Sequence, residues 1–171
     1  MTDGSARENE DMSHPPSLRH ASLTIVRHGS LLESGCAAFV NPVNTVGIMG
    51  KGLAWEFKTR WPEMFQDYVS YCRAGKLQPG SLHVWPFRGH DQWIVNLPTK
   101  RHWRDPSRLA DVTAGVDALV TWARQAQPVS LAIPALGCGL GGLPWDAVQA
   151  MMMERLMPIA DQINIQIYAP R

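Results

Sequence analysis

Short apolar segments alternate with amphipathic segments along most of this chain, and this alternation limits the folds that it can adopt. Short apolar or β-branched runs predict strands, whereas longer segments with an apolar stripe predict helices. A chain that alternates in this way buries both faces of a sheet under helices. The sequence therefore predicts an α/β fold, a three-layer α/β/α sandwich with a mixed central sheet. The expected strands span residues 23–26, 37–40, 82–87, 92–97, 130–134 and 164–168, and the expected helices span 53–61, 64–74, 106–127 and 144–157.

Prolines set several of the expected boundaries. The pair Asn41-Pro42 is expected to stop the second strand. Asp105 is expected to cap the third helix with Pro106 in its first turn, and Pro128 is expected to end that helix. This helix has the clearest apolar stripe in the chain, formed by Leu109, Val112, Val116, Leu119, Val120 and Ala123.

Length and composition fit one domain that can bury a core. The chain has 171 residues, and its 16 Lys and Arg against 15 Asp and Glu give a formal charge of +1, which excludes a globally basic nucleic-acid binder. Residues 1–20 are polar and lack periodicity, so we expect a flexible leader followed by one domain over 21–171. The sequence contains no apolar run of membrane-spanning length and no secretory signal. We expect a cytoplasmic monomer that makes no membrane contact.

The cysteines and histidines do not predict a metal site. Cys36, Cys72 and Cys138 are widely spaced and form no C-x-x-C pair, which excludes a disulfide framework and a zinc ribbon. The histidines show no metal-ligand spacing. We therefore expect neither a metal nor a cofactor.

Three segments follow expected strands, where open α/β sheets bind their ligands. We call residues 41–52 (NPVNTVGIMGKG) the first glycine loop, residues 134–142 (PALGCGLGG) the second glycine loop, and residues 97–104 (LPTKRHWR) the cationic segment. One glycine loop alone can be only a tight turn, but two in one short domain favour a diphosphate bound between their backbone amides. Neither loop matches the P-loop or the dinucleotide-binding fingerprint, which disfavours nucleotide hydrolysis and dinucleotide redox chemistry.

The motifs NPVNTVGIMGKGLA, NLPTKRHWR and PALGCGLGGLPW closely resemble those of macro domains, in which the first motif is the ADP-ribose-binding loop. Together they resemble the branch that contains the DNA ADP-ribosyl glycohydrolases, in which the human terminal ADP-ribose protein glycohydrolase is a relative. The resemblance covers residues 23–168 and implies the macro domain fold. It also implies an ADP-ribosyl glycohydrolase that removes mono-ADP-ribose from a modified macromolecule.

The resemblance further implies which residues form the site. Asn41 and Asn44 would bracket the distal ribose, and Lys100 in the T-K-R motif would be catalytic. The first glycine loop would wrap the distal ribose and the diphosphate through Val46, Gly47, Ile48, Met49, Gly50 and Lys51. The second glycine loop would bind phosphate through Leu136, Gly137, Cys138, Gly139, Leu140, Gly141 and Gly142.

Two positions depart from the pattern of the resembled proteins. Gly141 stands where the human relative has an aspartate, which is thought to release a lysyl intermediate, so that carboxylate is missing here. Ser30 follows Gly29 where many macro domains have an aspartate that holds the adenine amino group. Serine can still form a hydrogen bond at this position.

Lysine is a chemically reasonable catalyst for cleavage of an ADP-ribosyl bond, in which positive charge builds up on the anomeric carbon. A neutral Lys100 amine could attack that carbon or the opened sugar, and Arg101, His102 and Arg104 are expected to lower its pKa by repulsion. A protonated Lys100 could instead stabilise the leaving group, and a solvated surface lysine is the remaining alternative. Cys138 is interpreted as a small packed residue rather than a nucleophile.

The substrate is left open by the sequence. The first hypothesis is thymine-linked ADP-ribose on DNA, with the cationic segment to hold the phosphate backbone and Trp85, Trp93 and Trp103, which are nearby in the sequence, to stack bases. The cationic segment could equally be a surface loop whose arginines pair with local acids. The alternatives are esters of ADP-ribose on protein Asp or Glu side chains, and a reader that binds ADP-ribose without cleaving anything. The expected partners are ADP-ribose, ADP-ribosylated DNA or protein, and a cognate ADP-ribosyltransferase toxin.

Overall fold

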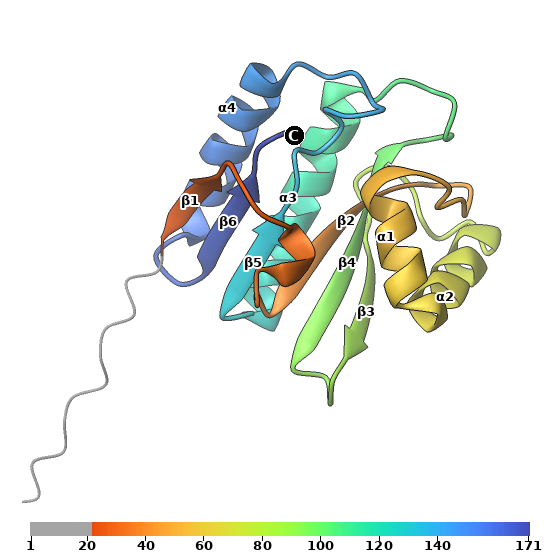
Figure 1. The fold of residues 1–171 in the computed structure, drawn as a ribbon, viewed down its shortest axis with the longest axis horizontal. Coiled ribbons are helices and arrows are strands. Elements are labelled where there is room, and N and C mark those ends of the chain that lie inside the picture. The colour runs from red at the N-terminus through yellow and green to blue at the C-terminus, as the bar shows by residue number, and fades with distance from the viewer. Residues whose placement is uncertain (1–21) are drawn as a thin grey trace, which may run out of the picture.

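The computed structural model describes residues 22–171 (Figure 1). The expected leader over residues 1–20 and the first residue of the expected domain lie outside the described residues. The strands are β1 (Leu23–Val26), β2 (Ala38–Asn44), β3 (His83–Phe87), β4 (Gln92–Lys100), β5 (Ser130–Ile133) and β6 (Asn164–Tyr168). The helices are α1 (Gly52–Arg60), α2 (Pro62–Arg73), α3 (Leu109–Ala126) and α4 (Trp145–Leu156), with 3-10 turns η1 (Leu31–Glu33) and η2 (Met157–Ile159).

The strands form one mixed sheet in the order β1-β6-β5-β2-β4-β3. All neighbouring pairs are parallel except β3 and β4, which form an antiparallel hairpin at one edge. The carboxyl ends of the five parallel strands therefore meet at the same edge of the sheet, the upper edge in Figure 1. This edge is where ligands bind in α/β folds.

Helices cover both faces of the sheet, which confirms the predicted three-layer sandwich (Figure 1). On one face, α3 and α4 pack on the strands through the apolar stripe predicted from the sequence, including the fully buried Val112, Val116 and Leu119. Leu109, the first residue of that stripe, is exposed. On the other face, α1, α2 and η1 cover a second core around Phe57, Met64 and Phe39. Among residues 22–171, no helix combines the length and apolar character that a membrane crossing requires.

The second strand is longer than predicted. Asn41-Pro42 does not stop it, because β2 continues to Asn44. The pairing explains how proline is accommodated: β5 pairs with β2 only at Ala38 and Phe39, so the β5 side of Pro42 has no strand partner. A proline can lack its N–H on such an unpaired side without losing a ladder hydrogen bond.

The start of α3 was also predicted wrongly. Asp105 is not its N-cap, because α3 begins at Leu109 and its N-cap residue is Arg108. The backbone upstream is engaged elsewhere: the Asp105 amide donates to the His102 carbonyl at 3.1 Å, and the Ser107 amide donates to the Gly141 carbonyl at 2.9 Å. The turns that precede α3 therefore belong to the ligand-binding edge and not to the helix.

Candidate active site

A cleft of about 1610 Å³ opens at the carboxyl edge of the sheet. Its walls come from the segments that follow β1, β2, β4, β5 and β6, so both glycine loops and the cationic segment reach it. Arg27, Lys51, Lys100 and Arg104 line it, whereas Glu56 is the one side-chain carboxylate that does so among the described residues. This balance of charge favours an anionic ligand.

The structure divides the predicted site residues into two groups. The first group lines the cleft: Asn44, Ile48, Gly50, Lys51, Lys100, Gly137, Cys138, Gly139, Leu140 and Gly141. The second group lies behind or beside the lining: Asn41, Val46, Gly47, Met49, Leu136 and Gly142. Met49 and Leu136 in this second group are core side chains, with exposed fractions of 1% and 0%. Their side chains therefore anchor the two loops in the core.

Asn44 braces the first glycine loop. Its Oδ1 accepts hydrogen bonds from the amides of Val46 (3.1 Å) and Ile48 (3.3 Å), and its Nδ2 donates to the Ile48 carbonyl at 2.7 Å. The Tyr68 hydroxyl, buried under the loop, donates to the Asn44 carbonyl at 2.7 Å. Burial raises the pKa of Tyr68, so its proton stays available for this bond. These hydrogen bonds of Asn44 and Tyr68 fix the conformation of the first glycine loop at the cleft.

Asn41 lies behind the cleft in a buried polar row that crosses three strands. The sheet register places Asn41 of β2 beside Asn96 of β4, and Asn96 beside His83 of β3. Asn41 Nδ2 donates to Asn96 Oδ1 at 2.8 Å, and Asn96 Nδ2 lies 2.9 Å from His83 Nδ1. His83 Nε2 lies 2.7 Å from Asp67 of α2, which ends the row at the surface. Contact of Asn41 with a ligand stays a prediction.

A β-bulge places Lys100 opposite Asn44. Val43 of β2 pairs with Pro98 of β4, but the next residue, Asn44, pairs with Lys100, so Thr99 is an extra residue on β4. Bulges of this kind change the direction of a side chain near a functional site. The strand thus ends on Lys100, and not at Leu97 as predicted, with the lysine beside the first glycine loop.

The Lys100 amine connects the cationic segment to the second glycine loop. Its Nζ donates to the carbonyl of Leu140 at 3.0 Å and to the carbonyl of Trp103 at 3.3 Å. It forms no ion pair with a carboxylate among the described residues. An amine held only by neutral carbonyls keeps its position without a fixed counter-charge. The cationic segment also contacts the first glycine loop, because Thr45 Oγ1 donates to the Arg101 carbonyl at 2.7 Å.

The other basic residues of the cationic segment differ in their partners, and Arg101 follows the alternative of an arginine paired with a local acid. Arg101 forms two hydrogen bonds with Asp111 of α3, at 3.0 and 3.1 Å, which raises the pKa of Arg101 and leaves its charge largely compensated. Arg104 lies over the Trp103 ring, 4.5 Å from its centroid, and His102 stacks on the same ring at 5.4 Å. Of the two arginines in this segment, Arg104 lines the cleft and Arg101 does not.

Of the three tryptophans expected near the cationic segment, only Trp103 lies there. Trp93 packs edge-on against Trp122 of α3 and Trp85 stacks on Phe87, both near the opposite end of the β3–β4 hairpin. A strand rises about 3.3 Å per residue, so proximity in the sequence does not bring the ends of β4 together. The prediction that Trp85 and Trp93 join this cluster was wrong.

The second glycine loop is shaped by Ser107, a residue that the sequence did not single out. A Cβ at Gly141 would collide with Ser107 Oγ and would lie 2.5 Å from the Gly137 carbonyl, and a Cβ at Gly137 would lie 2.8 Å from Leu143. Gly137 also has a φ of +73°. A Cβ at Gly139 would meet nothing within 4 Å. The loop therefore requires glycine at 137 and 141 for packing and faces open space at 139.

Backbone amides at the cleft are free to bind an anion. Within residues 22–171, the amides of Gly139, Leu140 and Gly141 make no hydrogen bond to another backbone group. On the opposite wall, α1 begins at Gly52, and its N-cap residue Lys51 makes no capping bond. A helix N-terminus and a glycine loop that face one cleft are a suitable site for phosphate groups.

Cys138 fits its interpretation as a packed residue. It is half-buried, its Sγ lies 3.7 Å from the Leu136 carbonyl, and burial raises its thiol pKa. A raised pKa keeps the thiol protonated at neutral pH, which disfavours nucleophilic attack. Glu56, Tyr68, Ser107 and Tyr168 are residues of the site that sequence reasoning missed, because their places depend on contacts between distant segments.

The comparisons with known proteins agree with this geometry. The family model described as Macro domain matches residues 40–152, and the chain therefore belongs to the macro domain family. The solved macrodomain of Mycobacterium tuberculosis DarG is 39% identical with a TM-score of 0.82, and the match covers 86% of this chain and 99% of that one. Thermosipho africanus DarTG, solved in complex with ADP-ribose, is 34% identical with a TM-score of 0.80, covering 87% of this chain and 42% of that one.

Among curated proteins, the chain is 42% identical over 145 residues to the DNA ADP-ribosyl glycohydrolase of Thermus aquaticus. That match covers 83% of this chain and 40% of the relative. The chain thus spans well under half the length of that curated relative.

Proposed function

We propose that this chain is an ADP-ribosyl glycohydrolase that binds ADP-ribose in the cleft and removes mono-ADP-ribose from thymine bases of DNA. The observation that carries the proposal is the position of Lys100 between the two glycine loops. Its Nζ donates a hydrogen bond to the carbonyl of Leu140 in the second loop, and its backbone is paired in the sheet with Asn44 of the first. The names of the relatives, one bound to ADP-ribose and one a DNA ADP-ribosyl glycohydrolase, support the ligand and the activity.

The binding part of the proposal rests on the two glycine loops. The diphosphate would lie between the free amides of Gly139, Leu140 and Gly141 and the N-terminus of α1. The first glycine loop, braced by Asn44, would hold the distal ribose. This arrangement would bring the anomeric carbon of that ribose toward Lys100.

The catalytic step breaks the bond between the anomeric carbon and the base, and water finally supplies a hydroxyl to the sugar while the base leaves with a proton. Lys100 can act in two ways. As a neutral amine it would form a bond to the anomeric carbon, and water would later displace it. As an ammonium it would stabilise the departing base by charge and hydrogen bonding.

Gly141 limits how a lysyl intermediate could be resolved. An aspartate at this position would need a Cβ where Ser107 and the Gly137 carbonyl already lie. The loop therefore has no room for the carboxylate of the human relative, and water would have to act without it. A reader that binds ADP-ribose without cleavage is the second candidate function, and this missing carboxylate is the observation that favours it.

The rim beside Lys100 supports a nucleic acid as the modified macromolecule. Trp103 is 45% exposed, and its backbone carbonyl accepts the Lys100 hydrogen bond. His102 and Arg104 cover part of the Trp103 ring, and the exposed remainder of Trp103 lies beside the positive charge of Arg104. Bases stack on such rings, and the phosphate backbone favours arginine. Such a hydrolase also requires a cognate ADP-ribosyltransferase that adds the modification.

A release assay tests the proposal. The purified chain is incubated with thymine-linked ADP-ribosylated single-stranded DNA and, in parallel, with glutamate-linked ADP-ribosylated protein. We expect release of ADP-ribose from the DNA. Release from the protein alone would replace the DNA substrate by the ester substrate, and release from neither, with ADP-ribose still bound in calorimetry, would leave the reader.

Trp103→Ala sharpens the test of the substrate. We expect release from DNA to fall about tenfold, because one stacked base is lost, while the affinity for free ADP-ribose stays unchanged. Trp55→Ala is the matched control, since Trp55 is an exposed tryptophan on α1 outside the cleft lining. Equal rates on DNA for both variants would contradict a stacking role for Trp103.

A further inference from the structure

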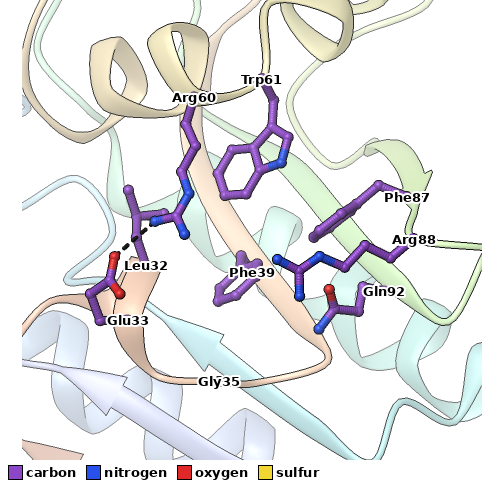
Figure 2. A pocket seen from close by; sticks show the side chains of 9 residues that line it. All are labelled: Leu32, Glu33, Gly35, Phe39, Arg60, Trp61, Phe87, Arg88 and Gln92. Atoms are coloured by element: carbon purple, nitrogen blue, oxygen red, sulfur yellow. Dashed lines mark hydrogen bonds and ion pairs between the residues drawn. The ribbon is translucent and has the colours of Figure 1, made fainter.

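A second, smaller pocket lies at the far end of α1 (Figure 2). Its volume is about 190 Å³, and it lies between η1, the end of α1, the start of β2 and the β3–β4 hairpin. The first residue of α1, Gly52, lines the large cleft, whereas its last residue, Arg60, lines this pocket. Eight helical steps separate the two, about 12 Å along the helix axis. We call this second cavity the arginine pocket.

Two arginines reach the arginine pocket from opposite sides. Figure 2 shows the guanidinium groups of Arg60 and Arg88 both turned toward the space in front of Phe39. Arg60 Nη1 donates to Glu33 at 2.8 Å, which orients it. Arg88 forms no ion pair within residues 22–171. Two positive charges with one carboxylate leave the pocket net positive, so it favours an anion.

Aromatic rings form the wall behind the arginines. Trp61 lies 5.5 Å from Phe87 and 6.1 Å from Phe39 between ring centroids, and Phe39 lies 6.4 Å from Phe87. Phe39 is almost fully buried, whereas Trp61 and Phe87 are half-buried, so part of each residue stays exposed. The Arg60 guanidinium lies over the Trp61 ring, 5.1 Å from its centroid. Exposed ring surface beside arginines can bind the face of a planar group, as it does in proteins that stack nucleobases.

A buried acceptor completes the chemistry of the pocket. Gln92 Oε1 is buried and has no hydrogen-bond donor among the described residues, although Gln92 lines the pocket. Buried polar atoms normally have a partner, so a ligand with an N–H group would satisfy it. Nucleobases carry such N–H groups on a planar ring.

We propose that the arginine pocket binds a nucleotide, with the base against Trp61 and Phe87 and its N–H toward Gln92. The phosphate lies between Arg60 and Arg88. The nucleotide comes from one of two sources, a free mononucleotide or one unit of a single strand, which present the same chemistry. This site is separate from the ADP-ribose cleft and does not depend on the hydrolase activity.

Calorimetry with a blocked cleft tests the proposal. The chain is first loaded with one equivalent of ADP-ribose, which fills the cleft, because an excess of ADP-ribose is itself a nucleotide and would compete for the arginine pocket. The loaded chain is then titrated with dTMP, with a short oligo-dT strand, and with inorganic phosphate. We expect one dTMP site to remain, and we expect inorganic phosphate to bind it about tenfold more weakly because it lacks the stacked base. An oligo-dT strand that binds more tightly than dTMP identifies the strand as the source, and equal affinity identifies the mononucleotide.

Paired variants assign the site to the arginine pocket. Arg88→Asn removes the free charge at a φ of +47°, a conformation that asparagine tolerates, and Arg60→Gln removes the second charge. We expect the double variant to lose at least about tenfold in dTMP affinity, as for two charge-assisted contacts. Arg73→Gln, which removes an exposed arginine at the end of α2, is the matched control and should bind dTMP as wild type does.

Three results would overturn the proposal: no dTMP binding to the chain loaded with one equivalent of ADP-ribose, equal dTMP affinity in wild type and the double variant, or equal affinity for dTMP and inorganic phosphate. Failure of the proposed function is distinguishable, because it would be seen as absence of ADP-ribose binding in the first titration. The variants of the arginine pocket would then still report whether dTMP binds there.

Discussion

The two glycine loops face the same cleft but are held in different ways. The first loop is held by side chains, since Asn44 binds two of its amides and Tyr68 binds Asn44 from below. The second loop is held by close packing of its glycine backbone, since Gly141 packs against Ser107 with no space for a Cβ. The first glycine loop should therefore lose its conformation when a hydrogen bond is removed, and the second when a side-chain atom is added to a glycine.

Changes in the two loops and changes at Lys100 should have different effects on ligand binding and on turnover. Lys100 is attached to the second loop through Leu140, and it is paired in the sheet with Asn44 of the first. A change in either loop should therefore shift both the ligand-binding backbone and the position of Lys100. Loop variants should therefore lower affinity and turnover together, whereas loss of the amine should lower turnover alone.

The largest structural effect is expected for Gly141→Ala. The added Cβ would collide with Ser107 and the Gly137 carbonyl, so the loop must shift. We expect a loss of about 1–3 kcal/mol in the free energy of unfolding and ADP-ribose affinity at least tenfold weaker. Urea denaturation and calorimetric titration measure the two effects.

Gly139→Ala is the control for that experiment, because a Cβ there meets no atom within 4 Å. Its free energy of unfolding should match that of wild type. Equal destabilisation by both substitutions would show that the loop is not held by close packing at Gly141.

A smaller effect is expected for Tyr68→Phe, which tests the first loop. The phenyl ring keeps the packing but removes the hydrogen bond to the Asn44 carbonyl. We expect a loss of about 1 kcal/mol in stability and ADP-ribose affinity a few-fold weaker. Tyr71→Phe on the same helix, whose hydroxyl forms no hydrogen bond within the described chain, should change neither, and a similar loss in both would contradict the clamp.

The smallest effect is a dependence of stability on alkaline pH. Burial raises the pKa values of Tyr68 and Cys138 in the native chain, whereas the unfolded chain releases these protons near their ordinary pKa values of 10.0 and 9.0. The unfolded state therefore binds fewer protons above pH 9, and the free energy of unfolding falls as the pH rises. Urea denaturation between pH 7.5 and 10.5 measures this fall, and Tyr68→Phe should flatten it. A stability that rises across this range would contradict the prediction.

The layers of the fold could be predicted because each element carries its own pattern. The stripe that includes Val112, Val116 and Leu119 indicated a helix and the face that it buries. The errors arose where tertiary pairing overrides a local signal. Pro42 reads as the end of a strand, but β2 continues because it stays paired with β4 as far as Asn44. Proline is tolerated there because β5 no longer pairs with β2 at this position. Asp105 reads as a helix cap, but its backbone belongs to a turn at the cleft.

The segments that meet at the cleft could be predicted from the sequence, but the contacts between them could not. The sequence indicated that the two glycine loops and Lys100 follow strands, and the parallel sheet brings them together. The extra residue Thr99, which places Lys100 beside Asn44, has no signature in the sequence. The same holds for Ser107, whose contact with Gly141 forms across a gap of many residues.

The central claim is that Lys100 performs the chemistry while the glycine loops bind the ligand. The direct measurement is single-turnover release of ADP-ribose from thymine-linked DNA by wild type, Lys100→Ala and Lys100→Arg, with ADP-ribose affinity measured for each. Lys76→Ala, which removes a lysine outside the cleft lining, is the matched control.

We predict that Lys100→Ala releases ADP-ribose at least about 100-fold more slowly, with affinity within a few-fold of wild type, and that Lys76→Ala is unaffected. Partial activity of Lys100→Arg would assign the lysine an electrostatic role, because arginine keeps the charge but not a neutral amine. Release at the wild-type rate by Lys100→Ala would contradict the account.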